Sequence, residues 1–348
     1  EIYTLPLLGA LPICAPIAGG VVLQVASDLP AQVSFEIADN EDFSGSSAID
    51  GGRTDAYDAV ARDVGGLAPG THWWRPRLRR AGLETVGPKR SFRVLPPAGD
   101  PQPVSLVYGS CGSQFNAIFD RIAERRPDVF IWQGDLNYPD AHGPLAQNLP
   151  GYAGAWRHFL DNPRIAPILE RCSFVAGRDD HDYGVQDSNA ANLRPWGVAP
   201  WESLMNPRTY HRFTAGLLEV WVLDQRKYKD DPTLPDTPEK SLLGMQQRQW
   251  LFDGLRASTA PFKLICSPAT LAPSGVANAR DGSWAAGFTA ERDLLLQHLR
   301  DNVSGQAAFL SGDTHFTMLW QRDGLFEQRA CPLDIPPPND VSIANPDL

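Results

Sequence analysis

The stretch Val129-Phe130-Ile131-Trp132-Gln133-Gly134-Asp135-Leu136-Asn137-Tyr138 begins with a run that suits a buried strand and ends in polar groups. The same order recurs at three other places. Val104–Tyr108 precedes Gly109-Ser110-Cys111-Gly112, Ser173–Ala176 precedes Arg178-Asp179-Asp180-His181-Asp182-Tyr183-Gly184, and Ala307–Leu310 precedes Ser311-Gly312-Asp313-Thr314-His315. Open α/β sheets bind their ligands at the carboxyl ends of the strands. We therefore expect these four polar clusters to meet at one edge of the fold.

The rest of this region alternates between helical and strand-like patterns. Helices are predicted over Ala117–Arg126, Gln246–Arg256 and Glu291–Asp301. Further strands are predicted over Gly216–Leu223 and Phe262–Ser267. Alternation of this kind is typical of a layered α/β fold.

The region from about residue 20 to residue 95 contains short strands separated by turns instead. The strands are predicted over Gly20–Val25, Gln32–Ile37, Trp73–Leu78 and Ser91–Val94. With the turn Leu67–Thr71, this pattern is typical of a small β-sandwich of the fibronectin type III or immunoglobulin type. The Pro-rich run Pro96–Pro103 cannot continue a sheet interior. We place the boundary there, with an N-terminal β-sandwich at residues 1–98 and an α/β domain at residues 103–348.

The composition and the net charge limit the classes of protein to which this chain can belong. The 348 residues are 43% hydrophobic, which suits an ordinary globular protein, and carry a formal net charge of −10. This charge argues against a broad electropositive surface, so no stoichiometric nucleic acid complex is expected. Clustered carboxylates can bind cations, and a bound cation would allow the site to receive a phosphate.

The cysteines and the N-terminal segment give two further expectations. Five cysteines without a CxxC pair indicate neither a zinc ribbon nor a dense disulfide framework. Leu5–Ala26 is apolar, but its prolines and glycines would break a membrane helix, so no transmembrane segment is expected. The chain starts at Glu1, as a processed secreted protein would.

Single candidate residues carry little weight by themselves. Cys111 alone would be a small buried apolar residue, Asp135 a turn residue, and Tyr138 a packing residue. The run Asp179–Asp182 places four ionisable groups in sequence, which repel one another unless water or a cation neutralises them. Asp313 and His315 are alternate residues after a strand and therefore face the same side. Together these groups predict a metal site.

This combination resembles the PhoD-like branch of the calcineurin-type metallophosphoesterases over about residues 104 to 320. The motifs that carry the resemblance are Ser-Cys, Gly-Asp-x-x-Tyr, Asp-Asp-His-Asp-Tyr-Gly and Ser-Gly-Asp-x-His, in this order. Supporting matches are Leu223–Tyr228 and Leu243–Leu251. One departure is Arg178, which stands where the family has an aromatic residue.

The resemblance implies a four-layer αββα sandwich. It also implies an enzyme that hydrolyses phosphodiesters or phosphomonoesters, whose substrates are small molecules or polymers. The enzyme would be bacterial and secreted, periplasmic or attached to the cell surface. The resemblance further implies that Cys111, Tyr138 and Asp313 bind Fe³⁺, that Asp135 bridges to a second cation, and that Asp180 and His315 hold that cation, taken as Ca²⁺. His181 would be the general acid or would stabilise the phosphate. Four more residues are candidates for contacts with these ligands or for lining the pocket: Asp179, Asp182, Asp187 and Arg226. Asp281, Trp284 and His211 are weaker candidates for the pocket, because an isolated polar residue usually serves a local hydrogen bond.

Two other functions remain open on sequence grounds. Cys111 could be the nucleophile of a thiol hydrolase, with His315 as base and Asp313 or Asp224 orienting it. The thiol-hydrolase hypothesis gives no role to Asp135, Tyr138 or Asp179–Asp182. Alternatively, the chain could be an extracellular protein that binds calcium without catalysis.

Overall fold

The computed structural model describes residues 15–27, 29–55, 58–112, 115–136, 138–139, 148–205, 208–272, 281 and 283–334. Residues 5–14 of the apolar N-terminal segment lie outside these ranges, as do Asn137 and residues 140–147.

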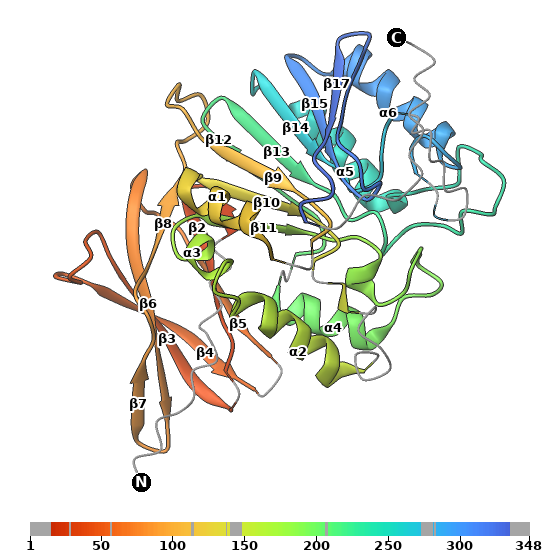
Figure 1. The fold of residues 1–348 in the computed structure, drawn as a ribbon. Helices are drawn as coiled ribbons and strands as arrows, with labels where there is room; N and C mark the ends of the chain where they lie inside the picture. Colours follow the sequence, from red (N-terminus) through yellow and green to blue (C-terminus); the bar gives the residue numbers. More distant parts are fainter. Residues whose placement is uncertain are drawn as a thin grey trace.

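The N-terminal part of the chain consists of strands (Figure 1). They are β1 (Ala15–Ile17), β2 (Gly20–Val25), β3 (Ala31–Ala38), β4 (Ser47–Thr54), β5 (Val60–Val64), β6 (Gly70–Arg80), β7 (Leu83–Val86) and β8 (Arg90–Val94). One sheet has the order β1-β2-β5, and the other has the order β4-β3-β6-β7 with β8 paired to β6. A hydrophobic core that includes Leu23, Phe35 and Trp74 joins strands of both sheets.

The larger part of the chain is a mixed α/β structure with two more sheets, as the sequence predicts. Its strands are β9 (Leu106–Gly109), β10 (Val129–Gln133), β11 (Ser173–Gly177), β12 (His211–Ala215), β13 (Leu218–Val222), β14 (Phe262–Cys266), β15 (Gln306–Ser311), β16 (Met318–Arg322) and β17 (Leu325–Arg329). Its helices are α1 (Ala117–Arg125), α2 (Leu149–Leu160), α3 (Ala166–Leu169), α4 (Pro195–Leu204), α5 (Gly244–Ala257) and α6 (Thr289–Asn302), with a short 3-10 helix η3 (His181–Tyr183).

The parallel sheet β11-β10-β9 and the six-stranded sheet β12-β13-β14-β15-β17-β16 pack against each other. Alternate side chains of β10 explain this packing. Val129 and Ile131 share a core with Val220 and Leu310 of the larger sheet. Because successive side chains of a strand point to opposite faces, the residues between them point away from the larger sheet.

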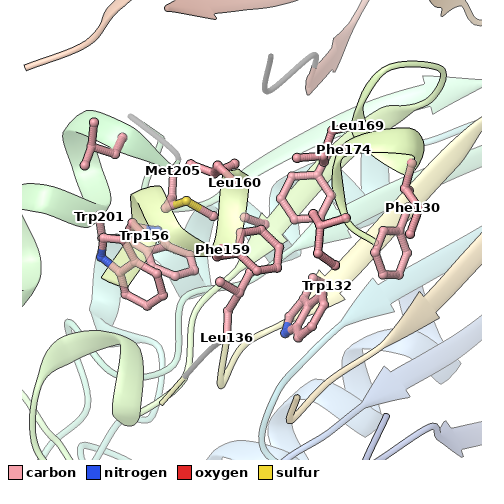
Figure 2. Packing of buried hydrophobic residues seen from close by; sticks show 14 of the residues in the cluster. Phe130, Trp132, Leu136, Trp156, Phe159, Leu160, Leu169, Phe174, Trp201 and Met205 are labelled. Carbon is pink, nitrogen blue, oxygen red and sulfur yellow. The ribbon is translucent and has the colours of Figure 1, made fainter. Parts of the chain in front are cut away.

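Those other side chains of β10 pack against helices, as Figure 2 shows. Phe130 and Trp132 lie in one cluster with Phe159 of α2 and Trp201 of α4. The outer face of the larger sheet is covered in the same way, since Trp221 shares a core with residues of α5 and α6. Helices therefore pack on the outer face of each sheet, through cores that include aromatic side chains.

The N-terminal sheets contact the α/β part through specific bonds as well as apolar packing. Arg93 Nη1 lies 2.7 Å from Asp128 Oδ1, and Ser91 N donates to the carbonyl of Glu170 at 2.9 Å. Val22 of β2 also belongs to the core that contains α2 and α4. The division into residues 1–98 and 103–348 stays a prediction.

Most predicted elements agree with the structure to within two residues, and the strand predicted over Trp73–Leu78 is longer, as β6. The strand predicted from Val104 begins two residues later, at Leu106, because Asp128 binds the residue before it: Ser105 N donates to Asp128 Oδ2 at 2.8 Å. The helices α2, α3 and α4 and the hairpin β16-β17 are not predicted from the sequence. Among the described residues, no helix is long and apolar enough to cross a membrane.

Candidate metal centre

The polar clusters after β9, β10, β11 and β15 meet at the ends of the two sheets. Asp135, Asp179, Asp180 and Asp313 each offer a carboxylate oxygen, and these oxygens lie within 4.8 Å of one another. A second group consists of Cys111, His315 and Cys331, whose ligand atoms lie within the same distance of one another. Tyr138 connects the two groups, because its hydroxyl lies 3.1 Å from Asp135 Oδ2 and 2.9 Å from His315 Nε2. All six residues predicted to bind metal are thus brought together.

Two glycines allow these loops to approach so closely. A Cβ atom on Gly134 would lie 2.5 Å from Asp179 Cβ, and Gly134 has a φ of +88°. A Cβ on Gly312 would lie 2.5 Å from Ser110 Oγ. Real Cβ atoms do not come this near to other atoms. The glycines of the two Gly-Asp pairs are therefore needed for the close approach of the loops as well as for the turns.

Five of the six predicted ligands have a left-handed backbone. The φ angles are 57° for Cys111, 56° for Asp135, 41° for Tyr138, 65° for Asp313 and 55° for His315. This conformation is uncommon for residues other than glycine and is concentrated at functional sites, where the surrounding structure enforces it. The fold therefore holds the backbone of these five residues in a strained conformation that directs their side chains into the site.

Burial and mutual repulsion oppose the negative charge of the carboxylates. Asp135, Asp179 and Asp180 are almost completely buried. Burial and the neighbouring Asp180 raise the pKa of Asp135 well above its usual value, and burial raises the pKa of Asp179 to about 7. Without a cation, these groups favour protonation.

Arg226 supplies part of the neutralising charge. Its guanidinium lies 2.5 Å from Asp179 Oδ1, pairs with Asp281, and lies 3.7 Å from Asp313 Oδ1. Burial acts to raise the pKa of Asp180, but the positive charge of Arg226, the ring of His181 and the hydrogen bond from Asp187 N together outweigh it and lower that pKa to about 2. Arg226 therefore contacts the cluster, as the sequence indicates, and Asp281 joins the site as its second partner.

Asp182 fixes the backbone of the site. Its carboxylate accepts hydrogen bonds from the backbone N–H groups of Asp135 at 2.9 Å, Leu136 at 3.1 Å and Asp179 at 2.8 Å. A single buried side chain thereby connects the loops that follow β10 and β11.

His181 is half-buried, its ring centroid is 4.4 Å from that of Tyr138, and one of its ring nitrogens lies within 4.8 Å of carboxylate oxygens of Asp135 and Asp180. Asp187 reaches the site through its backbone, since its N–H donates to Asp180 Oδ2 at 2.6 Å. Two of the weaker pocket candidates are structural. Trp284 donates to Ser267 Oγ at 2.9 Å within a buried core, and burial lowers the pKa of His211 to about 3.

The donor set suits cations. Asp135 Oδ1, Asp179 Oδ2 and Asp180 Oδ1 are buried and have no hydrogen-bond partner among the described residues. Buried polar atoms in native structures are normally satisfied, and a bound cation would satisfy these three oxygens. Carboxylate oxygens suit hard cations, whereas thiolate and imidazole suit transition metals. Oxygen donors and sulfur donors are both present here.

The thiol-hydrolase alternative has less support. Cys111 is completely buried, and burial together with the neighbouring Cys331 raises the pKa of its thiol. Nucleophilic cysteines are partly exposed and have lowered pKa values.

Two features were not found from the sequence. Cys331 gives no signal because it follows a hairpin that was not predicted. Arg178, which departs from the family pattern, is buried and donates to the Tyr183 hydroxyl at 2.6 Å, while Tyr183 also contacts Asp224. A charge network thus occupies the place of the expected aromatic residue.

The sequence and the fold of this chain are similar to those of known phosphatases. A family model described as PhoD-like phosphatase matches residues 179–329. Alkaline phosphatase D of Bacillus subtilis (strain 168) is 30% identical over a stretch that covers 30% of this chain and 21% of that protein. The match thus spans about a fifth of the length of that curated relative.

Two solved structures share the fold. The structure of PhoD has a TM-score of 0.78 at 18% identity, covering 94% of this chain and 77% of that chain. A purple acid phosphatase from yellow lupin (Lupinus luteus) seeds has a TM-score of 0.69 at 12% identity, covering 92% of this chain and 64% of that chain. The family match and the shared fold together lead to one conclusion: residues 179–329 are similar to the PhoD-like phosphatase family, within a fold that resembles those of PhoD and of a purple acid phosphatase.

Proposed function

We propose that this chain is a metal-dependent hydrolase of phosphodiesters, phosphomonoesters or both. The observation that carries the proposal is the convergence of four strand-end loops on buried carboxylate oxygens that lack hydrogen-bond partners among the described residues. Such a cluster is costly to bury unless a cation neutralises it.

Within this proposal, Cys111, Tyr138 and Asp313 would hold Fe³⁺, Asp180 and His315 would hold Ca²⁺, and Asp135 would contact both. The position of Asp135 supports this role: its Oδ2 lies 3.6 Å from Cys111 Sγ, its Oδ1 is buried without a hydrogen-bond partner among the described residues, and its carboxylate belongs to the group with Asp180. Sulfur and phenolate donors on one side and carboxylates on the other suit two cations of different hardness.

A pair of cations would activate a water molecule and hold the attacking and leaving oxygens of an in-line displacement. The side chains of the chain perform the remaining tasks. His181, beside Tyr138, delivers a proton to the leaving oxygen, a contribution worth about 10²–10⁴-fold. Asp182 keeps Asp135 and Asp179 in register through its three backbone hydrogen bonds. Arg226 limits repulsion among the carboxylates.

The proposal includes an architecture and a location. Residues 103–348 form the four-layer αββα catalytic domain, which the two facing sheets and their helical cores support. Residues 1–98 form a β-sandwich domain, which the core shared by the two N-terminal sheets supports. We place the protein outside the bacterial cytoplasm, by its resemblance to the family.

A metal analysis combined with a phosphoester panel tests the proposal. Purified protein is analysed for iron and calcium, then assayed with p-nitrophenyl phosphate and bis-p-nitrophenyl phosphate before and after chelation. We expect hydrolysis of at least one ester, loss on chelation and recovery on adding both metals. Asp253→Asn, on the exposed face of α5, is the control and should retain the wild-type rate. Full metal occupancy without hydrolysis of either ester would favour the non-catalytic binding protein.

A further inference from the structure

The buried sulfur atoms of two cysteines, Cys111 and Cys331, lie side by side in the candidate metal centre. Cys111 follows β9, Cys331 follows β17, and they are separated by 220 positions in the sequence. Their Sγ atoms are 3.0 Å apart, and both residues are completely inaccessible to solvent.

The backbone holds Cys331 in this position. Ser110 N donates to the Ala330 carbonyl at 3.2 Å, and Leu333 N lies 2.9 Å from the Ser110 carbonyl. Bonds on both sides of Cys331 therefore attach its segment to the loop that carries Cys111. The side chain of Leu333 closes the same contact, since a Cβ on Gly109 would lie 2.6 Å from Leu333 Cδ2.

The surroundings of Cys331 suit a sulfur that carries negative charge. The backbone N–H of His315 donates to Cys331 Sγ at 3.3 Å. A ring nitrogen of His315 and both sulfurs lie within 4.8 Å of one another. Tyr138 completes this group of side chains. Two thiols at such a distance form a donor pair for one transition metal.

We propose that Cys331 is a further thiolate ligand of the metal that Cys111 binds. This inference rests on the proposed function, because it assumes that a metal is bound at Cys111. Each thiol loses its proton to solvent when its sulfur binds the metal, so that a metal–sulfur bond replaces an S–H bond and no electrons are transferred. A pair of thiolates favours iron or zinc over calcium at this position.

X-ray absorption at the metal edge counts the sulfur neighbours directly. The test uses the purified metal-loaded protein, Cys331→Ser, and Cys172→Ser as a control, because Cys172 is also buried but belongs to the aromatic core against the helices. We expect two sulfur neighbours in the wild type and in Cys172→Ser. We expect one in Cys331→Ser, together with a shift of the sulfur-to-metal charge-transfer band.

Three outcomes would overturn the inference. One sulfur neighbour in metal-loaded wild-type protein would show that Cys331 only packs against Cys111, and this result needs no variant to fold. A mass lower by two hydrogen atoms, with neither thiol titratable after unfolding, would show a disulfide instead. The first result would leave the proposed function intact if the phosphoester assay succeeds, whereas the second would leave hydrolysis intact but remove Cys111 from the metal ligands. Protein that binds no metal at this position would overturn both.

Discussion

Replacing Asp135 by Asn should stabilise the metal-free protein and inactivate the metal-loaded protein. The side chain is only 2% exposed, and its Oδ1 has no hydrogen-bond partner among the described residues. Burial raises its pKa well above the usual value, which means that folding opposes its charge. The substitution keeps the shape of the side chain and removes that charge.

The size of the stabilisation follows from the burial. An uncompensated buried charge costs about 3–5 kcal/mol. With an unfolding entropy of about 2.1 cal/mol/K per residue, a change of about 3 kcal/mol corresponds to about 4 °C in Tm for a chain of 348 residues. In the metal-loaded protein, loss of a charge shared by two cations should reduce kcat by at least about 10³-fold, or about 4 kcal/mol.

The assay compares thermal unfolding of chelated wild-type and Asp135→Asn protein at pH 8 and then measures hydrolysis after both metals are restored. Asp253→Asn removes an exposed carboxylate and should change neither quantity appreciably. The reasoning would be refuted if Asp135→Asn lowered the Tm of the metal-free protein while leaving turnover near the wild-type rate, because Asp135 would then be a turn residue.

The remaining predictions concern colour, pH, the backbone of the site and proton transfer. Tyr138→Phe should weaken the visible charge-transfer absorption of the iron-loaded protein; an unchanged spectrum would exclude phenolate binding. Burial raises the pKa of Asp179 and of Asp182 to about 7 in the folded state. Their contribution to stability is therefore fully present below their usual pKa of 3.8 and is lost as the pH rises through about 7. Urea unfolding of chelated protein should accordingly give a lower free energy at pH 8 than at pH 5, and the reverse order would contradict the assigned environments. Asp182→Ala leaves three buried N–H groups without their acceptor and should cost at least about 3 kcal/mol in the same assay, whereas a cost below about 1 kcal/mol would mean that water replaces the carboxylate. His181→Ala should lower kcat by about 10²–10⁴-fold without changing metal content; retained turnover would assign proton delivery elsewhere.

The sequence predicts the strands that hold the site because their apolar runs are continuous. Val129–Gln133 is predicted and observed with the same bounds. A strand buried on both faces needs apolar residues throughout, and the polar residues that follow it mark its end clearly. The convergence of the four clusters then follows from the general position of sites in parallel sheets.

Other features depend on tertiary contacts that leave little local pattern. The helix α4 contains Pro200 and has no side-chain N-cap, so Pro195 at its first position is the one start signal that its sequence offers. It is stabilised instead by the core in which Trp201 lies against Trp156. The buried face of β17 carries two charged residues, Glu327 and Arg329, so the strand lacks an apolar pattern. Glu327 is buried because it accepts hydrogen bonds from the backbone of Leu271 and Ala272.

Cys331 was missed for the same reason. Its position depends on the pairing of β17 with β15 and on backbone bonds to Ser110, neither of which is visible locally. Arg226 was recognised only as a candidate, since its partner Asp281 is 55 positions away. Side chains that neutralise one another across a fold carry no periodic signal.

Anomalous scattering at the iron edge, measured on crystals of the active protein, tests the central claim most directly. The proposed function predicts an iron peak bonded to Cys111 Sγ and Tyr138 Oη, with Asp135 and Asp313 completing the contact. Fully active crystals with no anomalous peak within bonding distance of these four side chains would contradict it.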